Sequence, residues 1–270
     1  MTDEIFIWSA PEQDCRVPVH YKKSGNGPFL VLLHGFTESL RIWDTLTEAL
    51  SLQYTVIRPD LPGHGRTPEY SNTHTMEEMA EMLAEMLANY PPCILIGHSM
   101  GGYVALAYAE KYSERLLGIG LFHSTAAADS VDKKEDRLRA SALALQDKKG
   151  FITSLIPKLF APKNRLQMSA QIDVIKALAN DTSATGISAA LLGMRQRPDR
   201  THVLKTIPVP VLMLYGAFDE LIPPARSETE ASLPAICISE KLKSSGHMGF
   251  IEEPEETYRI IKTFAARCIQ

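Results

Sequence analysis

Ser99 lies at the centre of a short stretch whose residue types and spacing suit nucleophilic catalysis. The stretch reads Gly97-His98-Ser99-Met100-Gly101, with a glycine two residues before and two residues after the serine. A short buried strand is expected just before the stretch, and a helix directly after the serine. A serine at such a sharp strand-to-helix turn has a strained backbone, and the glycines avoid clashes with the neighbouring strand and helix. The stretch therefore predicts a serine nucleophile.

An acid and a base are needed as well, because a serine hydroxyl is a weak nucleophile on its own. Asp219 follows a predicted strand at residues 209–215, and His247 lies in a glycine-flanked loop after the next predicted strand, at residues 236–239. Loops at the carboxyl ends of parallel strands build the sites of open α/β sheets, so both side chains can reach Ser99. Serine, aspartate and histidine also follow one another in a known triad order. We therefore predict Ser99 as nucleophile, Asp219 as acid and His247 as base.

Other acids and histidines close to these positions are weaker candidates. Glu220 directly follows the predicted acid, but its side chain is expected to point elsewhere from the same turn. His98 flanks the serine and is expected to face away from the hydroxyl proton. His34 and His64 lie beside glycines in predicted loops, where we expect them to hold the backbone by hydrogen bonds. His123 follows a predicted strand and is expected near the site without an assigned role.

Backbone N–H groups are expected to bind the oxyanion that forms when a serine attacks a carbonyl group. Met100 supplies one of them, because its N–H lies at the N-terminus of the helix that follows the serine. The second is expected from Phe36, in the loop after an almost entirely apolar strand at residues 29–33. The predicted oxyanion hole is therefore made of two main-chain donors.

Composition limits the classes of protein to which the chain can belong. It has 270 residues, 45% of them apolar and 22% charged, as is typical of a soluble globular domain with a large core. The formal net charge of −4 argues against nucleic acid or an anionic membrane as the main partner. No apolar run is long enough for a transmembrane helix, and the N-terminus lacks the features of a signal peptide. Cytoplasmic localisation is the resulting expectation.

The four cysteines are widely separated and form no C-x-x-C pair. This spacing predicts neither a disulfide framework nor a zinc site. Cys93 and Cys237 lie in apolar runs and are expected to be buried, unreactive thiols. We therefore predict a site that uses no metal ion and no cofactor.

Strands and helices alternate over most of the chain, which predicts an α/β fold with a mostly parallel central sheet flanked by helices. Two short strands at residues 5–8 and 15–21 precede this pattern. They are expected to form an antiparallel hairpin at the edge of the sheet, connected through residues 11–14.

A helical insertion is predicted where the alternation stops, between residues 125 and 204. Helical patterns there cover residues 129–149, 151–160, 166–179 and 182–194. Their apolar residues, including Leu143 and Leu145, are more numerous than solvent-facing helices require. We predict that residues 1–124 and 205–270 form the α/β core and that residues 125–204 form a helical cap over the site.

Together these motifs resemble the α/β-hydrolase superfamily over essentially the whole chain. The resemblance rests on His34-Gly35-Phe36, Asp60-Leu61-Pro62-Gly63-His64-Gly65, Gly97-His98-Ser99-Met100-Gly101-Gly102, Gly216-Ala217-Phe218-Asp219 and Gly246-His247. Within the superfamily the chain is most similar to the small capped serine esterases and enol-lactonases. The resemblance implies a hydrolase that cleaves a carboxylic ester, thioester or lactone through an acyl-enzyme. The substrate is expected to be a small-molecule ester, and the many apolar residues of the predicted cap suggest an apolar acyl or aromatic group. A monomer or homodimer is expected.

Three other activities share this set of residues in the superfamily. A carbon–carbon bond hydrolase uses the same triad, and polar anchors for a substrate carboxylate in the cap pocket would favour it. A cofactor-free haloperoxidase or perhydrolase also has the same triad. A ligand receptor can retain the triad as well, but would lack sustained turnover of simple acyl esters.

Overall fold

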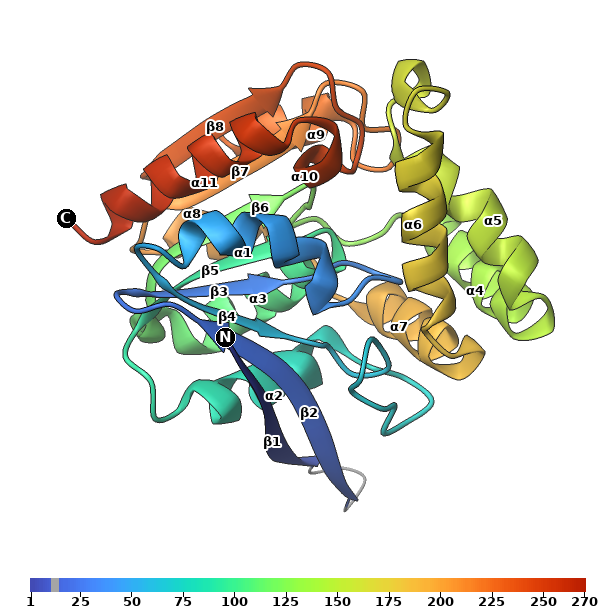
Figure 1. Ribbon diagram of the computed structural model, residues 1–270, viewed down its shortest axis with the longest axis horizontal. Helices are drawn as coiled ribbons and strands as arrows, with labels where there is room; N and C mark the ends of the chain where they lie inside the picture. The colour runs from blue at the N-terminus through green and yellow to red at the C-terminus, as the bar shows by residue number, and fades with distance from the viewer. Residues whose placement is uncertain (11–14) are drawn as a thin grey trace.

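The protein is described by a computed structural model that covers residues 1–10 and 15–270 (Figure 1). Its centre is an eight-stranded sheet in the order β1-β2-β4-β3-β5-β6-β7-β8. The strands are β1 (Thr2–Ala10), β2 (Cys15–Ser24), β3 (Phe29–Leu33), β4 (Thr55–Pro59), β5 (Cys93–His98), β6 (Leu116–Phe122), β7 (Val211–Gly216) and β8 (Cys237–Leu242). β1 and β2, and β2 and β4, pair antiparallel, and all other neighbours pair parallel. This confirms the predicted α/β fold with a mostly parallel sheet.

The predicted hairpin at the sheet edge is confirmed by β1 and β2, which pair along their whole length. Both strands are longer than the sequence pattern indicates. The predicted connection through residues 11–14 lies outside the residues that the structure describes.

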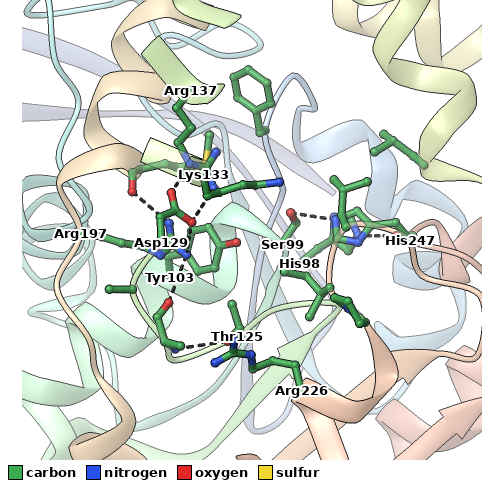
Figure 2. Close-up of a pocket in the computed structure, with 18 of the residues that line it drawn as sticks. His98, Ser99, Tyr103, Thr125, Asp129, Lys133, Arg137, Arg197, Arg226 and His247 are labelled. Atoms are coloured by element: carbon green, nitrogen blue, oxygen red, sulfur yellow. Dashed lines mark hydrogen bonds and ion pairs between the residues drawn. The ribbon is translucent and has the colours of Figure 1, made fainter. Parts of the chain in front are cut away.

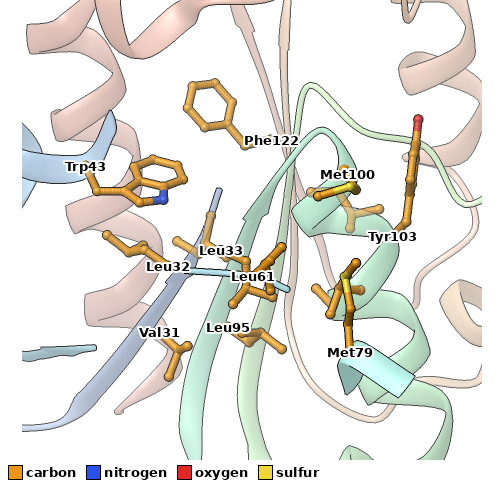
Figure 3. Close-up of a cluster of buried hydrophobic side chains, with 14 of the residues drawn as sticks. Val31, Leu32, Leu33, Trp43, Leu61, Met79, Leu95, Met100, Tyr103 and Phe122 are labelled. Atoms are coloured by element: carbon orange, nitrogen blue, oxygen red, sulfur yellow. The ribbon is translucent and has the colours of Figure 1, made fainter. Parts of the chain in front are cut away.

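Helices cover both faces of the sheet (Figure 1). The α-helices of the described chain are α1 (Asp44–Leu50), α2 (Met76–Leu87), α3 (Met100–Tyr112), α4 (Val131–Gln146), α5 (Lys148–Leu159), α6 (Ser169–Asn180), α7 (Ala184–Gln196), α8 (Thr201–Thr206), α9 (Pro224–Glu230), α10 (Gly249–Glu252) and α11 (Pro254–Cys268). α1 contacts α11 on one face, whereas α3 contacts α2 and α8 on the other. Figure 3 shows the core between these layers, with Trp43 on one side of β3 and β5 and with Met79 and Met100 on the other.

The helix α2 illustrates how local sequence sets an element. Thr75 caps its first turn by accepting the Glu78 N–H, and the Glu78 side chain returns to the Thr75 N–H, which forms a capping box. The glutamates of the helix are partly or fully exposed. Its four methionines are all buried against the core: Met76, Met79, Met82 and Met86. The methionines of α2 therefore pack in the core, as their helical spacing predicts, and do not form a binding surface.

The cysteines differ in burial according to their place in the sheet. Cys93 is buried in the central strand β5, and burial raises the pKa of its thiol to about 12, so it is unreactive as predicted. Cys237 is only half-buried, which corrects the expectation of a buried thiol. It lies in β8, the edge strand, which has a neighbour on one side only.

Helices α4 to α7 lie together to one side of the sheet, at the right of Figure 1. Contacts between α4 and α7, α4 and α5, and α5 and α6 make them one group. The predicted helix at residues 129–149 ends earlier, at Gln146, because the Asp147 side chain accepts the Gly150 N–H and starts α5. The division at residues 124/125 and 204/205 stays a prediction, and its second boundary falls inside α8.

Among residues 1–10 and 15–270, no helix combines the length and the apolar character that crossing a bilayer requires.

Candidate active site

The turn around Ser99 has the strained backbone that its sequence predicts. Ser99 lies between β5 and α3 with φ 49° and ψ −114°, a left-handed conformation that is rare for residues other than glycine. Its N–H donates to the Phe122 carbonyl oxygen at 2.9 Å, and its own carbonyl accepts from the Ser124 hydroxyl at 2.8 Å. The end of β6 and the loop after it therefore hold the turn through both the N–H and the carbonyl group of Ser99.

Gly97 and Gly101 are required by close backbone approach. A Cβ atom on Gly97 would lie 2.2 Å from the carbonyl group of Gly101, in the first turn of α3. A Cβ atom on Gly101 would lie 2.6 Å from the carbonyl oxygens of Leu33 and His34, at the end of β3. Both distances are shorter than any real carbon contact, so a side chain at either position would push the turn out of place.

The structure brings the three predicted site residues together in one hydrogen-bonded chain (Figure 2). His247 Nε2 lies 2.9 Å from Ser99 Oγ, and His247 Nδ1 lies 2.7 Å from Asp219 Oδ2. The side chains of Asp219 and His247 are almost completely buried, at 0% and 3% exposure. Ser99, Asp219 and His247 follow β5, β7 and β8, and these strands run parallel, so all three end at the same edge of the sheet.

Asp219 accepts hydrogen bonds on both carboxylate oxygens. Oδ1 accepts the N–H groups of Leu221 and Ile222, each at 2.9 Å, which fixes the plane of the carboxylate. Oδ2 lies 3.1 Å from His123 Nδ1 in addition to His247. Burial alone would raise the pKa of Asp219, but the His247 charge and the hydrogen bonds from both histidines hold that pKa well below its usual value of 3.8. The acid is therefore an ionised acceptor.

His123 is a functional neighbour to which the sequence reasoning assigned no role. Burial lowers the pKa of His123 to about 4, so its ring is neutral at physiological pH. Its Nε2 accepts the Gly249 N–H at 3.2 Å, which leaves the proton on Nδ1, facing Asp219. His123 therefore donates a second hydrogen bond to the buried carboxylate and ties it to the loop that carries His247.

The side chains of His123, Asp219 and His247 also have the composition of a metal site. Ligand-type atoms of His123, Asp219 and His247 lie within 4.8 Å of one another, and all three residues are buried. Hydrogen bonds account for each of these atoms, because the carboxylate accepts from both rings. We therefore interpret the group as a hydrogen-bonded cluster.

A second buried network lies behind the serine. His98 Nδ1 lies 3.0 Å from Glu38 Oε2, and His98 Nε2 lies 2.9 Å from the His247 carbonyl oxygen. Glu38 also accepts the Gly35 N–H at 2.5 Å. His98 therefore faces away from the Ser99 hydroxyl, as predicted, and connects the loop after β3 to the loop that carries His247.

Glu38 and His98 form an ion pair inside the protein. Burial opposes both charges, but their mutual interaction lowers the pKa of Glu38 and raises the pKa of His98. We expect Glu38→Gln to lower the free energy of unfolding by on the order of 3 kcal/mol, because it leaves a buried imidazolium without its partner. Urea unfolding of both proteins measures this difference.

The destabilisation is expected to depend on pH in a defined way. The Glu38 contribution is present above the ordinary glutamate pKa of 4.5 and is lost as pH falls through the lowered folded-state pKa. The His98 contribution is complete below 6.5 and is lost as pH rises through the raised folded-state pKa. The difference in the free energy of unfolding between wild type and Glu38→Gln should therefore be largest between pH 4.5 and pH 6.5. Glu48→Gln, on the exposed side of α1, is the control, and equal stabilities of wild type and Glu38→Gln at every pH would contradict the ion pair.

Of the two residues predicted to supply oxyanion donors, Met100 directly follows the serine and Phe36 lines the same cavity. Met100 is the first residue of α3, so its N–H has no partner within the helix. Phe36 follows β3 in the loop that Glu38 holds. In the part of the chain that the structure describes, neither N–H donates to a protein acceptor. Both N–H groups therefore have no protein acceptor among the described residues.

The other two histidines weighed above have structural roles. His34 Nε2 accepts the Leu61 N–H at 2.9 Å, and its Nδ1 contacts the Gly35 carbonyl oxygen at 2.8 Å. His64 Nδ1 lies 3.0 Å from the Pro62 carbonyl oxygen. Both rings hold loop backbone, as predicted.

A cavity of about 260 Å³ opens in front of Ser99 and His247. Leu155 and Leu159 of α5 and Met194 of α7 form part of its apolar wall. Leu143 and Leu145 do not take part and are about half exposed, at 46% and 53%, so they face solvent and the surplus of apolar residues is smaller than predicted. The N–H of His247 also donates to the Leu159 carbonyl oxygen at 2.6 Å, which joins the base to α5.

Charged residues line the same cavity, and the sequence reasoning did not identify them. Figure 2 shows Asp129, Lys133 and Arg137 together on one side of the space before Ser99. Lys133 and Arg137 are four residues apart and share one face of α4, and Asp129 lies just before the N-terminus of this helix. The spacing of the two cations was a signal that could have been read from the sequence.

Comparisons with known proteins identify the family of the chain. The family model described as alpha/beta hydrolase family matches residues 30–260. The chain is 30% identical to a pimeloyl-[acyl-carrier protein] methyl ester esterase of Aeromonas hydrophila, over 91% of this chain and 98% of the relative. Two solved structures are similar over nearly their whole length. A thermophilic esterase from Thermogutta terrifontis, solved with malate bound, has a TM-score of 0.93 and 30% identity, with 98% of this chain and 99% of that chain covered.

The second structure is an enol-lactonase from Burkholderia xenovorans LB400. It has a TM-score of 0.86 and 21% identity, covers 96% of this chain and 99% of its own, and supports the fold. The chain therefore belongs to the alpha/beta hydrolase family, in an esterase-like branch of these enzymes.

Proposed function

We propose that the protein hydrolyses a carboxylic ester through a covalent acyl-enzyme on Ser99. The observation that carries this proposal is the unbroken hydrogen-bonded chain from Ser99 through His247 to Asp219, with the serine open to a cavity. Ser99 Oγ attacks the ester carbonyl carbon while His247 Nε2 takes its proton and then gives it to the leaving alcohol. A water molecule, deprotonated by His247, cleaves the acyl-enzyme and releases the acid. Asp219 holds the imidazole and stabilises its charged form.

Oxyanion stabilisation is assigned to the N–H groups of Met100 and Phe36. Neither has an acceptor among the described residues, and Met100 lies at a helix N-terminus, where the helix dipole favours negative charge. Losing a donor of this kind costs about 10² to 10³ in turnover in other serine hydrolases. Here both donors are main-chain groups, so side-chain substitution does not remove them.

A cap role is proposed for residues 125–204. Leu155, Leu159 and Met194 in this segment line the cavity, and the ring of Phe151 lies 6.3 Å from that of Phe36, across from the oxyanion loop. The group α4 to α7 thus excludes water from one side of the serine, which strengthens the electrostatic interactions within the site.

A small ester is the proposed substrate. The cavity volume of about 260 Å³ is below the roughly 300–1,000 Å³ of pockets that bind drug-sized ligands. The names of the relatives, a methyl ester esterase and a thermophilic esterase, support ester chemistry. The apolar wall of the cavity supports an aliphatic or aromatic group beside the scissile bond.

A carbon–carbon bond hydrolase is the second candidate, because cationic side chains that could anchor a substrate carboxylate line the cavity. Such an enzyme would use the same serine and base on a vinylogous diketone. Cleavage of that substrate at a rate above ester hydrolysis would favour this second reading.

The experiment that tests the proposed function is steady-state hydrolysis of p-nitrophenyl esters from acetate to long-chain acyl groups. We expect sustained multiple turnover with an optimum at short acyl chains, because the cavity is small. A single turnover followed by arrest would support a receptor instead. No release of p-nitrophenol from any ester would contradict the proposed function.

A further inference from the structure

Positive charge is in excess around the cavity in front of Ser99. Four cationic side chains line it: Lys133, Arg137, Arg197 and Arg226. Two carboxylates line it as well, those of Glu38 and Asp129. Glu38 is already paired with buried His98, so Asp129 is the only lining carboxylate that can balance the four cations.

Asp129 is fully used by two of the four cations. Arg197 lies 2.8 Å from Asp129 Oδ1, and Arg137 Nε contacts Asp129 Oδ2. Burial would raise the pKa of Asp129, but hydrogen bonds from both guanidiniums outweigh it and hold that pKa below its usual range. Arg197 is fixed further by the ring of Tyr103, 3.9 Å from its guanidinium carbon, and by the Met194 and Ala127 carbonyl oxygens. One carboxylate therefore faces two fixed guanidiniums, which leaves one positive charge unbalanced.

Within the described chain, neither Lys133 nor Arg226 forms an ion pair. No carboxylate of residues 1–10 and 15–270 lies within 4.0 Å of either charged group. Glu230, one turn beyond Arg226 on α9, is buried, and its oxygens accept from Thr125 Oγ1 and the Ala126 N–H. Figure 2 shows Lys133 entering from one side of the space before Ser99 and Arg226 from the other.

Cations gathered without partners raise the free energy of the empty cavity and favour an anion that enters it. Lysine and arginine bind carboxylates through charge-assisted hydrogen bonds, and Lys133 and Arg226 offer such donors from exposed side chains that line the cavity. We propose that the natural substrate is an ester that carries a carboxylate at a distance from the scissile bond, held by Lys133 and Arg226. This inference rests on the proposed ester hydrolysis and adds the chemical class of the substrate.

The kinetic test compares two esters of equal chain length, monomethyl adipate, with one free carboxylate, and dimethyl adipate, with none. Acid release is followed in a pH-stat at low ionic strength, because salt screens charges at exposed side chains. We expect kcat/KM for monomethyl adipate to exceed that for dimethyl adipate by about tenfold, which is the effect of one good charge-assisted hydrogen bond.

The double variant Lys133→Ala/Arg226→Ala is expected to bring this ratio close to one. Lys133→Arg/Arg226→Lys, which keeps both charges, is expected to restore most of the preference. Lys134→Ala is the matched control, because Lys134 is the next residue on α4 and does not line the cavity. It is expected to keep the wild-type ratio. A ratio of one in the wild type, or a high ratio that survives in the double variant, would overturn the inference.

Calorimetric titration with sodium adipate separates this inference from the proposed function, because it needs no turnover. Adipate is expected to bind the wild type about tenfold more tightly than it binds the double variant, and neutral adipamide is expected to bind both equally. If adipate binds in this way but no ester is hydrolysed, the carboxylate site stands and ester hydrolysis fails. If neutral esters are hydrolysed but adipate binds both proteins equally, ester hydrolysis stands and the carboxylate site fails.

Discussion

Replacing Ser99 with alanine is expected to lower kcat for p-nitrophenyl acetate by at least about 10⁴-fold, since loss of the nucleophile in a serine triad removes almost all catalysis by the triad. The hydroxyl oxygen is the one atom of the site within hydrogen-bond reach of His247 Nε2 that can attack a carbonyl carbon. Alanine keeps the size of the residue near that of serine, so the left-handed turn at φ 49° is expected to persist. Release of p-nitrophenol measures the effect.

Ser113→Ala provides the matched control for this loss. Ser113 lies at the other end of the same helix, α3. Its substitution by alanine is expected to leave both kcat and the thermal unfolding midpoint unchanged. Wild-type turnover in Ser99→Ala, with a folded protein of normal melting temperature, would remove Ser99 from the mechanism. A residual rate above that in water is expected, because the oxyanion donors remain.

Asp219→Asn is expected to lower kcat by about 10⁴-fold, through the tautomer of His247 rather than through folding. The amide oxygen is expected to stay with the N–H groups of Leu221 and Ile222, which bind Oδ1 now. The amide NH₂ then faces His247 Nδ1, which must accept, so the imidazole proton moves to Nε2. In that tautomer Nε2 cannot take the proton of the Ser99 hydroxyl.

His123→Asn is the informative comparison, because His123 bonds the same carboxylate oxygen and has no contact with the serine. We expect its kcat to fall by about tenfold, the cost of one hydrogen bond to a buried charge. Steady-state assays on both variants measure the contrast. Equal losses in the two variants would mean that orientation of the carboxylate, not the tautomer of His247, explains the effect of Asp219→Asn.

The sequence sufficed to predict the parallel sheet, and it allowed Ser99, Asp219 and His247 to be proposed, for physical reasons that can be stated. Ser99 and Asp219 follow strands with a strong apolar pattern, and all three residues lie within three positions of a glycine that packs closely against other backbone. Parallel strands bring their carboxyl ends to one edge of the sheet, so residues far apart in sequence converge once the strand order is assumed. The oxyanion donors could be proposed for the same reason.

The supporting residues could not be predicted, because they depend on contacts between segments far apart in the chain. Glu38 and His98 are separated by 60 positions, and His123 and Asp219 by 96. No periodicity in the sequence relates such pairs. His123 at the end of β6 was a partial signal, but its Nδ1 contact with Asp219 depends on its own left-handed backbone, with φ 49°.

Local hydrogen bonds also set some element boundaries that apolar periodicity does not show. Leu40, Trp43, Leu46 and Leu50 have the apolar spacing of a single α-helix, but residues Leu40–Trp43 form a 3₁₀ turn before α1 begins. The Leu40 N–H donates to Asp60 Oδ1, and Arg58 donates to the Leu40 carbonyl oxygen at 3.3 Å, which ties this turn to the loop after β4. Such tertiary contacts override the helical pattern of the segment.

The central claim is that Ser99 is a nucleophile activated by His247, and labelling with a fluorophosphonate tests it most directly. The reagent reacts with an activated serine and needs no knowledge of the natural substrate. We expect one adduct per chain, located on Ser99 by peptide mass spectrometry, and labelling slowed by at least about 10³-fold in His247→Ala, which lacks the general base. An adduct on another residue, or equal labelling rates in wild type and His247→Ala, would contradict the account.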